Sequence, residues 1–329
     1  IWNIATHPRL VFFMIFFKLN SKTKYSDLFF ITEQIPNRDS NISLSDKRDI
    51  FGYPIAKVAS KLAVGYTLDE LKNDVTGTTS ACFEPALDYV ITKIPRFNFE
   101  KFEGVDEELT TQMKAVGEVM AIGRSFPESL QKAWQSLENG YAGLGADRDE
   151  TSRFEIRERL KKSYWDRTLQ IRNAFKLGAS VEEIGDITKV DPWFLFQIQD
   201  IVAIEEALHK LALHQVDVEF MRQVKRFGFS DLQIAYLVQD DVSEEEVRNY
   251  RKGLGLKPSY QLVDTCAGEF PAKTPYFYSS YESNTESVVS DKEKVLILGS
   301  GPNRIGQGIE FDYSCVHGVL ASKEMGYEA

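Results

Sequence analysis

A series of helix-start signals in the middle of the chain restricts its fold more than any other feature. At each signal a Ser stands three residues before a Glu or Gln, so its hydroxyl can accept from a first-turn N–H while the longer side chain reaches back to the Ser N–H. The pairs are Ser125 with Glu128, Ser180 with Glu183, Ser230 with Gln233 and Ser243 with Glu246, and Asp191 before Pro192 is a further signal. Apolar residues recur at helical spacing behind these signals, and nothing between residues 150 and 255 alternates like a strand. The sequence therefore predicts a central all-helical domain.

The region before this domain mixes helix and strand patterns. Residues 52–65 carry the one-sided apolar stripe of a helix. Thr67 and Glu70 form another capping pair, which predicts a short second helix that ends near Gly77. Strands are expected at residues 89–94 and around Phe97, Phe99 and Phe102, which are rich in β-branched and aromatic side chains. We therefore expect a mixed α/β region over residues 78–124.

The region after the helical domain begins as an extended segment. Residues 260–270 are predicted to be extended, and prolines and aromatics then mark an irregular crossing segment that is too aromatic to be a free linker. These residues are Pro271, Pro275, Tyr276, Phe277, Tyr278 and Tyr281. The continuous apolar run of residues 294–298 predicts a strand that is buried on both faces, and residues 309–325 predict a helix.

Glycines between that strand and that helix form a loop of the kind that approaches phosphate groups. Without a Cβ, glycine lets backbone N–H groups come close to an anion, and the following helix N-terminus adds about half a positive charge. The candidate anion-binding or nucleotide-binding residues are Gly299, Gly301, Asn303, Arg304, Gly306, Gln307 and Gly308. Pro302 removes one N–H donor, and Glu310 and Asp312 place carboxylates near the loop. A sharp packing turn is therefore the alternative to a Rossmann-type dinucleotide site.

Charge and cysteine content argue against several classes of function. Lys and Arg number 39 against 49 Asp and Glu, a net charge of -10, so we expect neither a nucleic-acid partner nor a membrane partner. The three cysteines lie far apart without a CxxC pair, which argues against disulfides or zinc and fits the cytoplasm. The longest apolar run, residues 10–17, is too short to cross a bilayer. The chain begins with Ile1, from which we expect a piece of a longer protein.

Other candidate reactive side chains have simpler explanations. Lys93, Arg96 and Lys101 flank aromatics as in sites for single-stranded nucleic acid, but the acidic chain favours a solvated strand face. His209 and His214 are five residues apart, which is the wrong spacing for one helix face, so surface histidines are favoured over a metal site. We assign no residue a catalytic or metal-binding role.

Six stretches of the chain, taken together, are typical of a single protein family. They are GYPIAKVASKLAVGY at 52–66, ACFEP at 81–85, DYVITKIPRFNFEKF at 88–102, QMKAVGEVMAIGR at 112–124, VDTCAGE at 263–269 and GPNRIGQGIEFDY at 301–313. In this order and spacing they resemble the large subunit of carbamoyl-phosphate synthase. The resemblance covers about residues 52–329.

The resemblance implies a ligase that joins bicarbonate, ammonia from glutamine and two ATP to give carbamoyl phosphate for arginine or pyrimidine synthesis. Such an enzyme has two homologous ATP-grasp halves, linked by a carbamate tunnel. It implies ATP with Mg²⁺ or Mn²⁺ as cofactors of the intact enzyme, a glutaminase small subunit or domain as partner, and a homo-oligomer formed through the helical domain. The glycine loop would frame the inner end of the second active site.

The same resemblance implies the fold class, which is α/β with a central all-α domain. The end of an ATP-grasp half would precede the helical oligomerisation domain, and the first β-loop-α unit of a Rossmann-like pre-ATP-grasp domain would follow it. The implied boundaries are 52–140 for the end of the carboxyphosphate half, 141–257 for the oligomerisation domain, 258–291 for an extended connector and 292–329 for the start of the second pre-ATP-grasp domain.

The first 51 residues depart from the family pattern. An acid-x-Asn-Pro-Arg motif should precede the helix at residue 52, because Mg²⁺ ions that clamp ATP phosphates need hard oxygen ligands. Glu33 and Asn37 lie in this region, but the Asn-Pro-Arg order is absent. We leave residues 1–51 unassigned, as non-native or disordered sequence, and expect no ATP or metal ion to bind fully to this fragment. A non-catalytic oligomerisation scaffold is the second hypothesis for the fragment, and an NAD-binding protein is the third.

Overall fold

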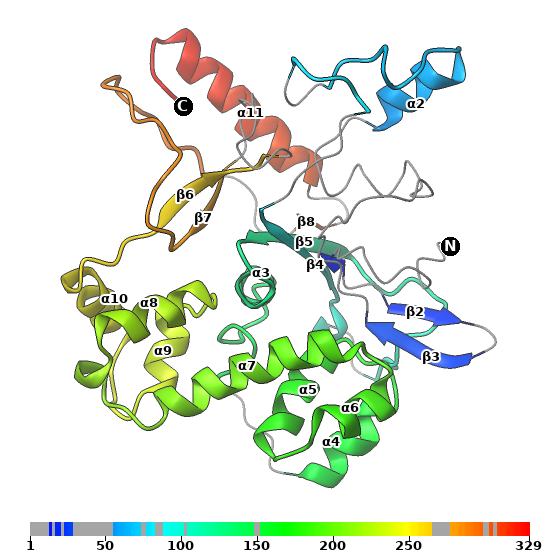
Figure 1. The fold of residues 1–329 in the computed structure, drawn as a ribbon, viewed down its shortest axis with the longest axis vertical. Coiled ribbons are helices and arrows are strands. Elements are labelled where there is room, and N and C mark those ends of the chain that lie inside the picture. Colours follow the sequence, from blue (N-terminus) through cyan, green and yellow to red (C-terminus); the bar gives the residue numbers. More distant parts are fainter. Residues whose placement is uncertain are drawn as a thin grey trace.

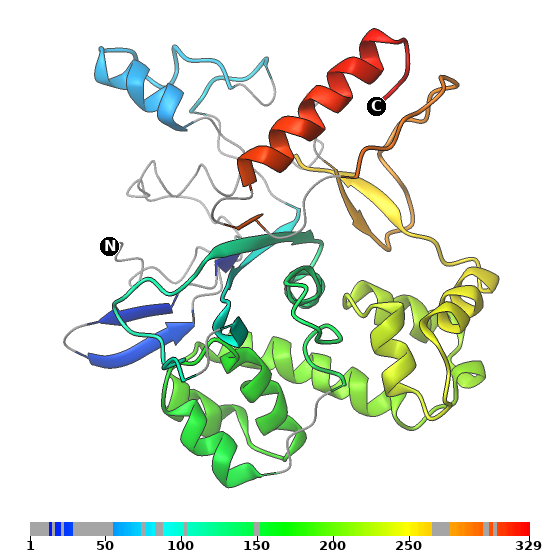
Figure 2. The same ribbon diagram turned by 180° about the vertical axis from the view of Figure 1, so that it is seen from behind.

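The computed structural model describes residues 13–14, 17–20, 23–28, 55–73, 77–82, 88–101, 104–147, 152–264, 277–298, 303–304 and 308–329. Within these ranges a large helical body lies on one side of a small sheet, and helices α2 (Ile55–Ala63) and α11 (Gly308–Glu324) lie on the other (Figures 1 and 2). The fold therefore mixes helices with small sheets, as the sequence predicts. No helix in the described residues is long and apolar enough to cross a membrane.

The helical body consists of eight α-helices and one 3₁₀ turn among the described residues. Their bounds are α3 Phe126–Ser136, α4 Arg153–Leu160, α5 Arg167–Lys176, α6 Val181–Thr188, α7 Pro192–Leu208, η2 Leu213–Gln215, α8 Val218–Arg226, α9 Asp231–Leu237 and α10 Glu244–Gly253. In Figure 1, α7 runs between a group formed by α4 to α6 and a group formed by α8 to α10. The predicted all-helical region is confirmed, because residues 152–255 contain no strand.

Each predicted cap residue of the helical body accepts a bond from the first turn of its helix, and the full reciprocal pair forms at α9 and α10. At α10, Ser243 N–H donates to the Glu246 carboxylate at 2.8 Å, and Glu246 N–H donates to the Ser243 hydroxyl at 3.2 Å. Ser180 caps α6, Asp191 caps α7 and Ser230 caps α9 with the same kind of bond from the first turn. The signal at α3 differs in one detail. Ser125 accepts from Glu128 N–H, but the Glu128 carboxylate accepts from Arg124 N–H rather than from Ser125. These local bonds mark where α3, α6, α7, α9 and α10 begin.

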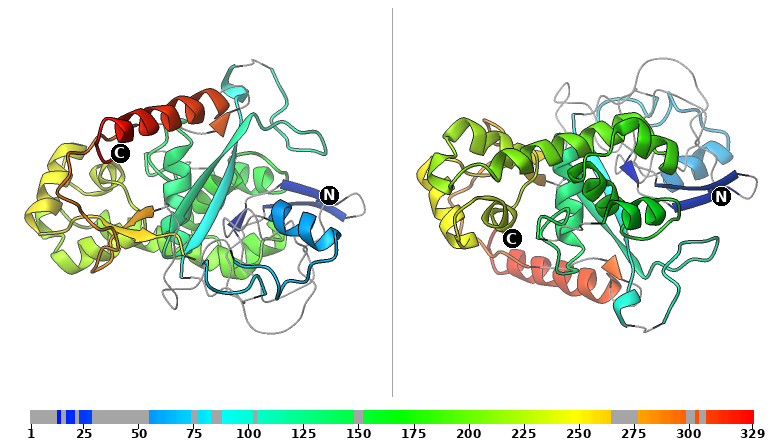
Figure 3. Two further views of the ribbon diagram at one scale, coloured as in Figure 1. Left: turned by 90° about the horizontal axis from the view of Figure 1, so that it is seen from above. Right: turned by 90° about the horizontal axis from the view of Figure 1, so that it is seen from below.

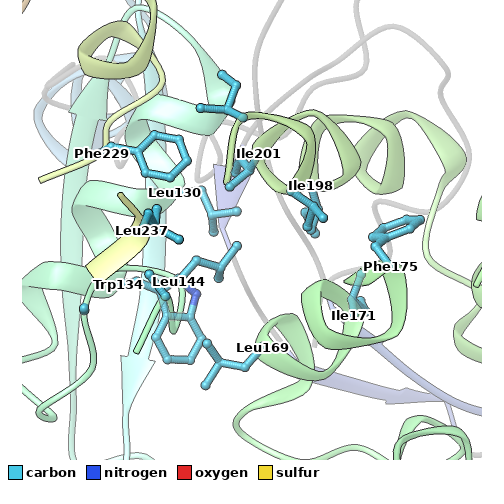
Figure 4. Packing of buried hydrophobic residues seen from close by; sticks show 14 of the residues in the cluster. Leu130, Trp134, Leu144, Leu169, Ile171, Phe175, Ile198, Ile201, Phe229 and Leu237 are labelled. Atoms are coloured by element: carbon cyan, nitrogen blue, oxygen red, sulfur yellow. The ribbon is translucent and has the colours of Figure 1, made fainter. Parts of the chain in front are cut away.

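One hydrophobic core holds the helical body together. Fully buried side chains from α3, α5, α7 and the α8–α9 turn meet in its centre (Figure 4). The labelled residues are Leu130, Trp134, Leu144, Leu169, Ile171, Phe175, Ile198, Ile201, Phe229 and Leu237. The same core includes Ile94 and Val119 of the sheet, so the sheet and the helices are packed as one unit.

The main sheet has the strand order β1-β4-β5-β8. Strands β4 (Val90–Arg96) and β5 (Gly117–Gly123) pair antiparallel, β1 (Phe13–Met14) lies parallel to β4, and β8 (Asn303–Arg304) pairs with Gly117 and Glu118 of β5. Helix α3 follows β5 directly and packs on β4 and β5, where Thr92 and Ser129 share a hydrogen bond of 2.7 Å. In the view from below in Figure 3, α7 and α11 lie on opposite sides of α3.

Two hairpins complete the fold. One joins β2 (Phe17–Asn20) to β3 (Thr23–Leu28). The other joins β6 (Ser259–Leu262) to β7 (Phe277–Ser280). In the second hairpin Tyr278 is buried, which agrees with the prediction that this aromatic segment is no free linker. The strand β6 confirms the first residues of the predicted extended segment, and residues 265–276 lie outside the described ranges.

Two local predictions before the helical body are wrong. Thr67 N–H does donate to the Glu70 carboxylate at 2.9 Å, but residues 68–70 form a turn instead of the predicted helix. The expected strand beyond Phe97 is a 3₁₀ turn, η1 (Phe99–Lys101), closed by a bond from Lys101 N–H to the Asn98 carbonyl. The rings of Phe97 and Phe99 stack at 5.3 Å between centroids. The strand preference of these residues therefore does not decide the local structure here.

Candidate functional site

The structure describes part of the predicted glycine-rich loop. Asn303 and Arg304 form strand β8 beside β5, and Gly308 begins helix α11. Gly299, Gly301, Gly306 and Gln307 lie outside the described residues. The predicted helix after the loop is confirmed with nearly the expected bounds. Anion or nucleotide binding by these residues stays a prediction.

The strand that was expected just before this loop is absent. Lys294 forms only an isolated parallel bridge with Glu328, and Val295 N–H donates to the Glu328 carbonyl at 2.8 Å. Leu296 and Leu298 are 85% and 88% exposed, so the apolar run is not covered on both faces. A buried parallel strand needs neighbouring strands and a helix layer on each face. Among the described residues the run makes a single β-bridge and no ladder, so it lacks the neighbouring strands that such a strand needs.

The structure brings together a charged cluster that the sequence did not reveal. Asp231, the first residue of α9, accepts from Arg251 at 3.0 and 2.7 Å and from Lys225 at 2.9 Å. Lys225 and Arg251 are both about 5% exposed, so their charges are held in a largely water-free place. Burial raises the pKa of Asp231, but the hydrogen bonds from Arg251 and Lys225 outweigh this and leave it below the ordinary value. The carboxylate is therefore held ionised between two cations.

A tyrosine ring from the C-terminal segment covers this cluster. The Lys225 ammonium lies 5.1 Å from the centroid of the Tyr281 ring, and the Arg251 guanidinium lies 5.5 Å from it. Burial raises the pKa of the Tyr281 hydroxyl to about 12. Arg226, at the end of α8, adds bonds to the Tyr281 carbonyl and to the Glu282 carboxylate. Three cations of the helical body thus meet one short segment after β7.

A second set of polar contacts joins α3 to the same hairpin. Lys132 donates to the Ser279 carbonyl at 2.6 Å and to the Ile122 carbonyl at 2.5 Å, so it bridges β7 and β5. A cleft of about 270 Å³ lies between α3, the α8–α9 turn and β7, and Glu128, Lys132 and Lys225 are among its lining residues. Burial lowers the pKa of Lys132 and raises the pKa of Glu128. The attraction between the two charges partly offsets both of these shifts.

Glu128 gives a pH-dependent prediction. Its raised pKa means that the folded state binds the proton more tightly than the unfolded chain, so its contribution to stability is largest in acid. That contribution is lost as pH rises from the ordinary Glu value of 4.5 through the raised value. Glu128→Gln has no carboxyl to titrate at this position, so we expect its free energy of unfolding to lack this dependence. Between pH 4 and pH 7 its free energy of unfolding should therefore rise relative to that of the wild type by on the order of 1 kcal/mol. Urea unfolding at the two pH values measures the difference.

Glu182 is the matched control, because its pKa is lowered by backbone and Ser180 hydrogen bonds at the start of α6. The stability that it contributes is present above pH 4.5 and is lost as pH falls, so Glu182→Gln should show the opposite trend. A Glu128→Gln difference that does not change with pH would contradict the prediction.

The other sequence candidates are paired or scattered. The Lys93 ammonium lies 3.0 Å from the Glu118 carboxylate, and the Arg96 guanidinium lies 2.6 Å from the Glu100 carboxylate. Two of the three cations near the aromatics are therefore neutralised by carboxylates. His209 follows the end of α7 and His214 lies in η2. Among the described residues, no group of three or more His, Cys, Asp or Glu side chains is arranged to hold a metal ion. Glu33 and Asn37 lie outside those residues.

Two family models match the chain. Residues 118–255 match the carbamoyl-phosphate synthetase large chain oligomerisation domain, and residues 291–329 match the carbamoyl phosphate synthase preATP-grasp domain. The first match covers β5 and the whole helical body, and the second covers the exposed apolar run, the glycine loop and α11. The predicted resemblance is therefore confirmed from two separate regions.

Curated relatives agree with the family models. The carbamoyl phosphate synthase large chain of Nostoc sp. is 54% identical over 91% of this chain and 27% of its own length. The large chain of Archaeoglobus fulgidus is 54% identical over 84% of this chain and 26% of its own length. The large chain of Neisseria meningitidis is 52% identical over 91% of this chain and 27% of its own length. The chain spans about a quarter of the length of the relatives it matches. A match over 91% of the chain is longer than residues 52–329, so it reaches into the first 51 residues.

Proposed function

We propose that this chain, which belongs to the carbamoyl phosphate synthase large-chain family, is the central segment of such a large chain. In that position it would connect the two catalytic halves. The single observation that carries the proposal is the match of residues 118–255 to the oligomerisation domain, since these residues include the helical body that forms most of the core. A segment whose main core is an assembly domain acts chiefly by holding other parts in place.

The whole protein would make carbamoyl phosphate from bicarbonate, glutamine-derived ammonia and two ATP. It would use Mg²⁺ or Mn²⁺ with the ATP and take ammonia from a glutaminase subunit or domain. Residues 52–140 would end the first ATP-grasp half, residues 141–257 would form the oligomerisation domain, residues 258–291 would be the connector, and residues 292–329 would open the second half. These assignments rest on the family resemblance and on the two family-model matches.

The glycine-rich residues would frame the inner end of the second active site. Gly308 at the start of the 17-residue helix α11 supports this role, because backbone N–H groups at a helix N-terminus favour an anion. Gly299, Gly301, Asn303, Arg304, Gly306 and Gln307 would complete the loop. The bulk of the contacts with ATP would come from other parts of the whole protein.

Two measurements on the purified 329-residue chain test the proposal. Light scattering coupled to size exclusion should give the mass of a defined oligomer, because the helical domain would mediate self-assembly. Bicarbonate should cause no increase in ATP hydrolysis, because the chain would lack a complete set of phosphate-clamping carboxylates. A monomer at tens of micromolar would contradict the assembly role, and bicarbonate-dependent turnover of ATP would contradict the non-catalytic role.

Titration with NAD separates the proposal from the alternative of a dinucleotide-binding protein. The fluorescence of the four tryptophans gives a signal for such a titration. No saturable change is expected, because Pro302 and the nearby carboxylates disfavour a pyrophosphate. Saturable binding at micromolar NAD would support the dinucleotide alternative instead.

A further inference from the structure

The short segment after β7 contacts a cluster of charged groups that are largely buried in the helical body. Asp231 binds both Lys225 and Arg251, and the two cations share the face of one aromatic ring, that of Tyr281. We propose that these four residues, here named the Tyr281 clamp, position the C-terminal segment on the helical body. In this assignment Tyr281 is a positioning residue, which acts through the chain that follows it.

Both cations are also bonded to the helical body away from the ring. Lys225 donates to the Phe229 carbonyl at 2.6 Å as well as to Asp231, and Arg251 donates to the Leu256 carbonyl at 2.8 Å as well as to Asp231. Their positions are therefore set within the helical body, by α8, α9 and α10. A ring placed over cations that are already fixed and desolvated gains more from the contact than a ring over a mobile surface lysine.

Arg251 lies where both ends of the β6–β7 hairpin leave the helical body. Its bond to the Leu256 carbonyl holds the chain that enters β6, which begins at Ser259. Its contact with Tyr281 holds the chain that leaves β7, which ends at Ser280. Glu282 N–H also donates to the Ser259 hydroxyl at 2.9 Å, so the entry and the exit of the hairpin are tied to each other. The Arg251 guanidinium thus contacts the chain at both ends of the hairpin.

Neighbouring contacts act in the same direction. Lys132 of α3 holds the Ser279 carbonyl, and Arg226 of α8 holds the Tyr281 carbonyl and the Glu282 carboxylate. These bonds fix the backbone on either side of the ring, so the clamp sets both the position and the direction of the chain that continues from residue 283. Placement of the second catalytic half by this chain rests on the proposed function, whereas the clamp itself does not.

Hydrogen exchange with mass spectrometry tests the clamp in the 329-residue chain. Tyr281→Leu removes the ring, and amides of residues 277–282 should exchange roughly tenfold faster because a desolvated contact with two cations is lost. Tyr281→Phe keeps the ring and should stay within about twofold of the wild type. Tyr236→Leu is the control, since Tyr236 of α9 is a 54% exposed tyrosine outside the clamp and its loss should leave residues 277–282 unchanged.

The outcomes separate a clamp from a general loss of structure. Faster exchange confined to the hairpin in Tyr281→Leu, with rescue by Tyr281→Phe, supports the clamp. Unchanged exchange in Tyr281→Leu, equal acceleration in Tyr281→Phe, or equal acceleration of the helical core would overturn it. The result does not depend on the oligomeric state or on ATP turnover, so failure of the proposed function and failure of the clamp are seen in different experiments.

Discussion

Glu205→Ala is expected to lower the free energy of unfolding by about 3–5 kcal/mol, because it leaves the charge of Arg172 buried without its carboxylate. Arg172 on α5 and Glu205 on α7 are both 0% exposed. The guanidinium donates to the two carboxylate oxygens at 3.0, 2.9 and 2.6 Å. A loss of this size is a large fraction of the roughly 5–15 kcal/mol of a typical domain. Urea unfolding followed by circular dichroism measures it.

Two further variants show whether the loss comes from the unpaired charge. Combining Arg172→Met with Glu205→Leu replaces both partners by apolar side chains and should recover most of the stability, because neither charge is then desolvated. Glu158→Gln breaks the exposed pair with Lys161 and should cost no more than about 1 kcal/mol. If Glu205→Ala were as mild as Glu158→Gln, the buried pair would not hold α5 to α7 as the structure indicates.

The start of most helices in the body follows from local sequence. A cap requires only a Ser or Asp and the backbone of the next turn, so Ser180, Ser230 and Ser243 could be recognised without knowledge of the fold. The pair Arg172 and Glu205 could not be recognised in this way, since 33 residues separate its members. Long-range partners leave no periodic signal in one sequence.

The sequence was less informative where strand and turn preferences depend on neighbours. Residues 294–298 have the composition of a buried strand, yet Leu296 and Leu298 are exposed in the described structure. Phe97 and Phe99 favour strands by composition, but Phe99 begins a 3₁₀ turn. In both cases the preference of the residue is conditional on surfaces that other parts of the chain supply.

The charged cluster around Asp231 was missed for a related reason. Its members come from α8, α9, α10 and the segment after β7, and each has an ordinary local role when taken alone. Lys225 stands in the last turn of α8 and Asp231 in the first turn of α9, positions where such charges favour the helix dipole. The only signal for Tyr281 was the high aromatic content of its segment, which predicted packing but not the partner.

Gly228→Ala is expected to lower the free energy of unfolding by about 2–5 kcal/mol, because the turn between α8 and α9 leaves no room for a Cβ. Gly228 has a φ of +86°, and an added Cβ would lie 2.8 Å from the Glu128 backbone. The close approach is fixed by a 2.9 Å bond from Gln131 to the Phe227 carbonyl, so α3 and the turn cannot separate without losing that bond. Urea unfolding of the variant measures the effect.

Gly178 separates the steric cost from the conformational cost. It ends α5 as Gly228 ends α8, with its N–H donating to the carbonyl three residues earlier and the next N–H donating to the carbonyl five residues earlier. Its φ is +80°, but nothing lies within 4 Å of an added Cβ, so Gly178→Ala should cost only the roughly 1–2 kcal/mol of a left-handed alanine. Equal losses for the two variants would mean that the turn moves away from α3 freely. A larger loss for Gly228→Ala, which we expect, would show that this contact fixes the α8–α9 turn, and with it Lys225 and Asp231, against the rest of the helical body.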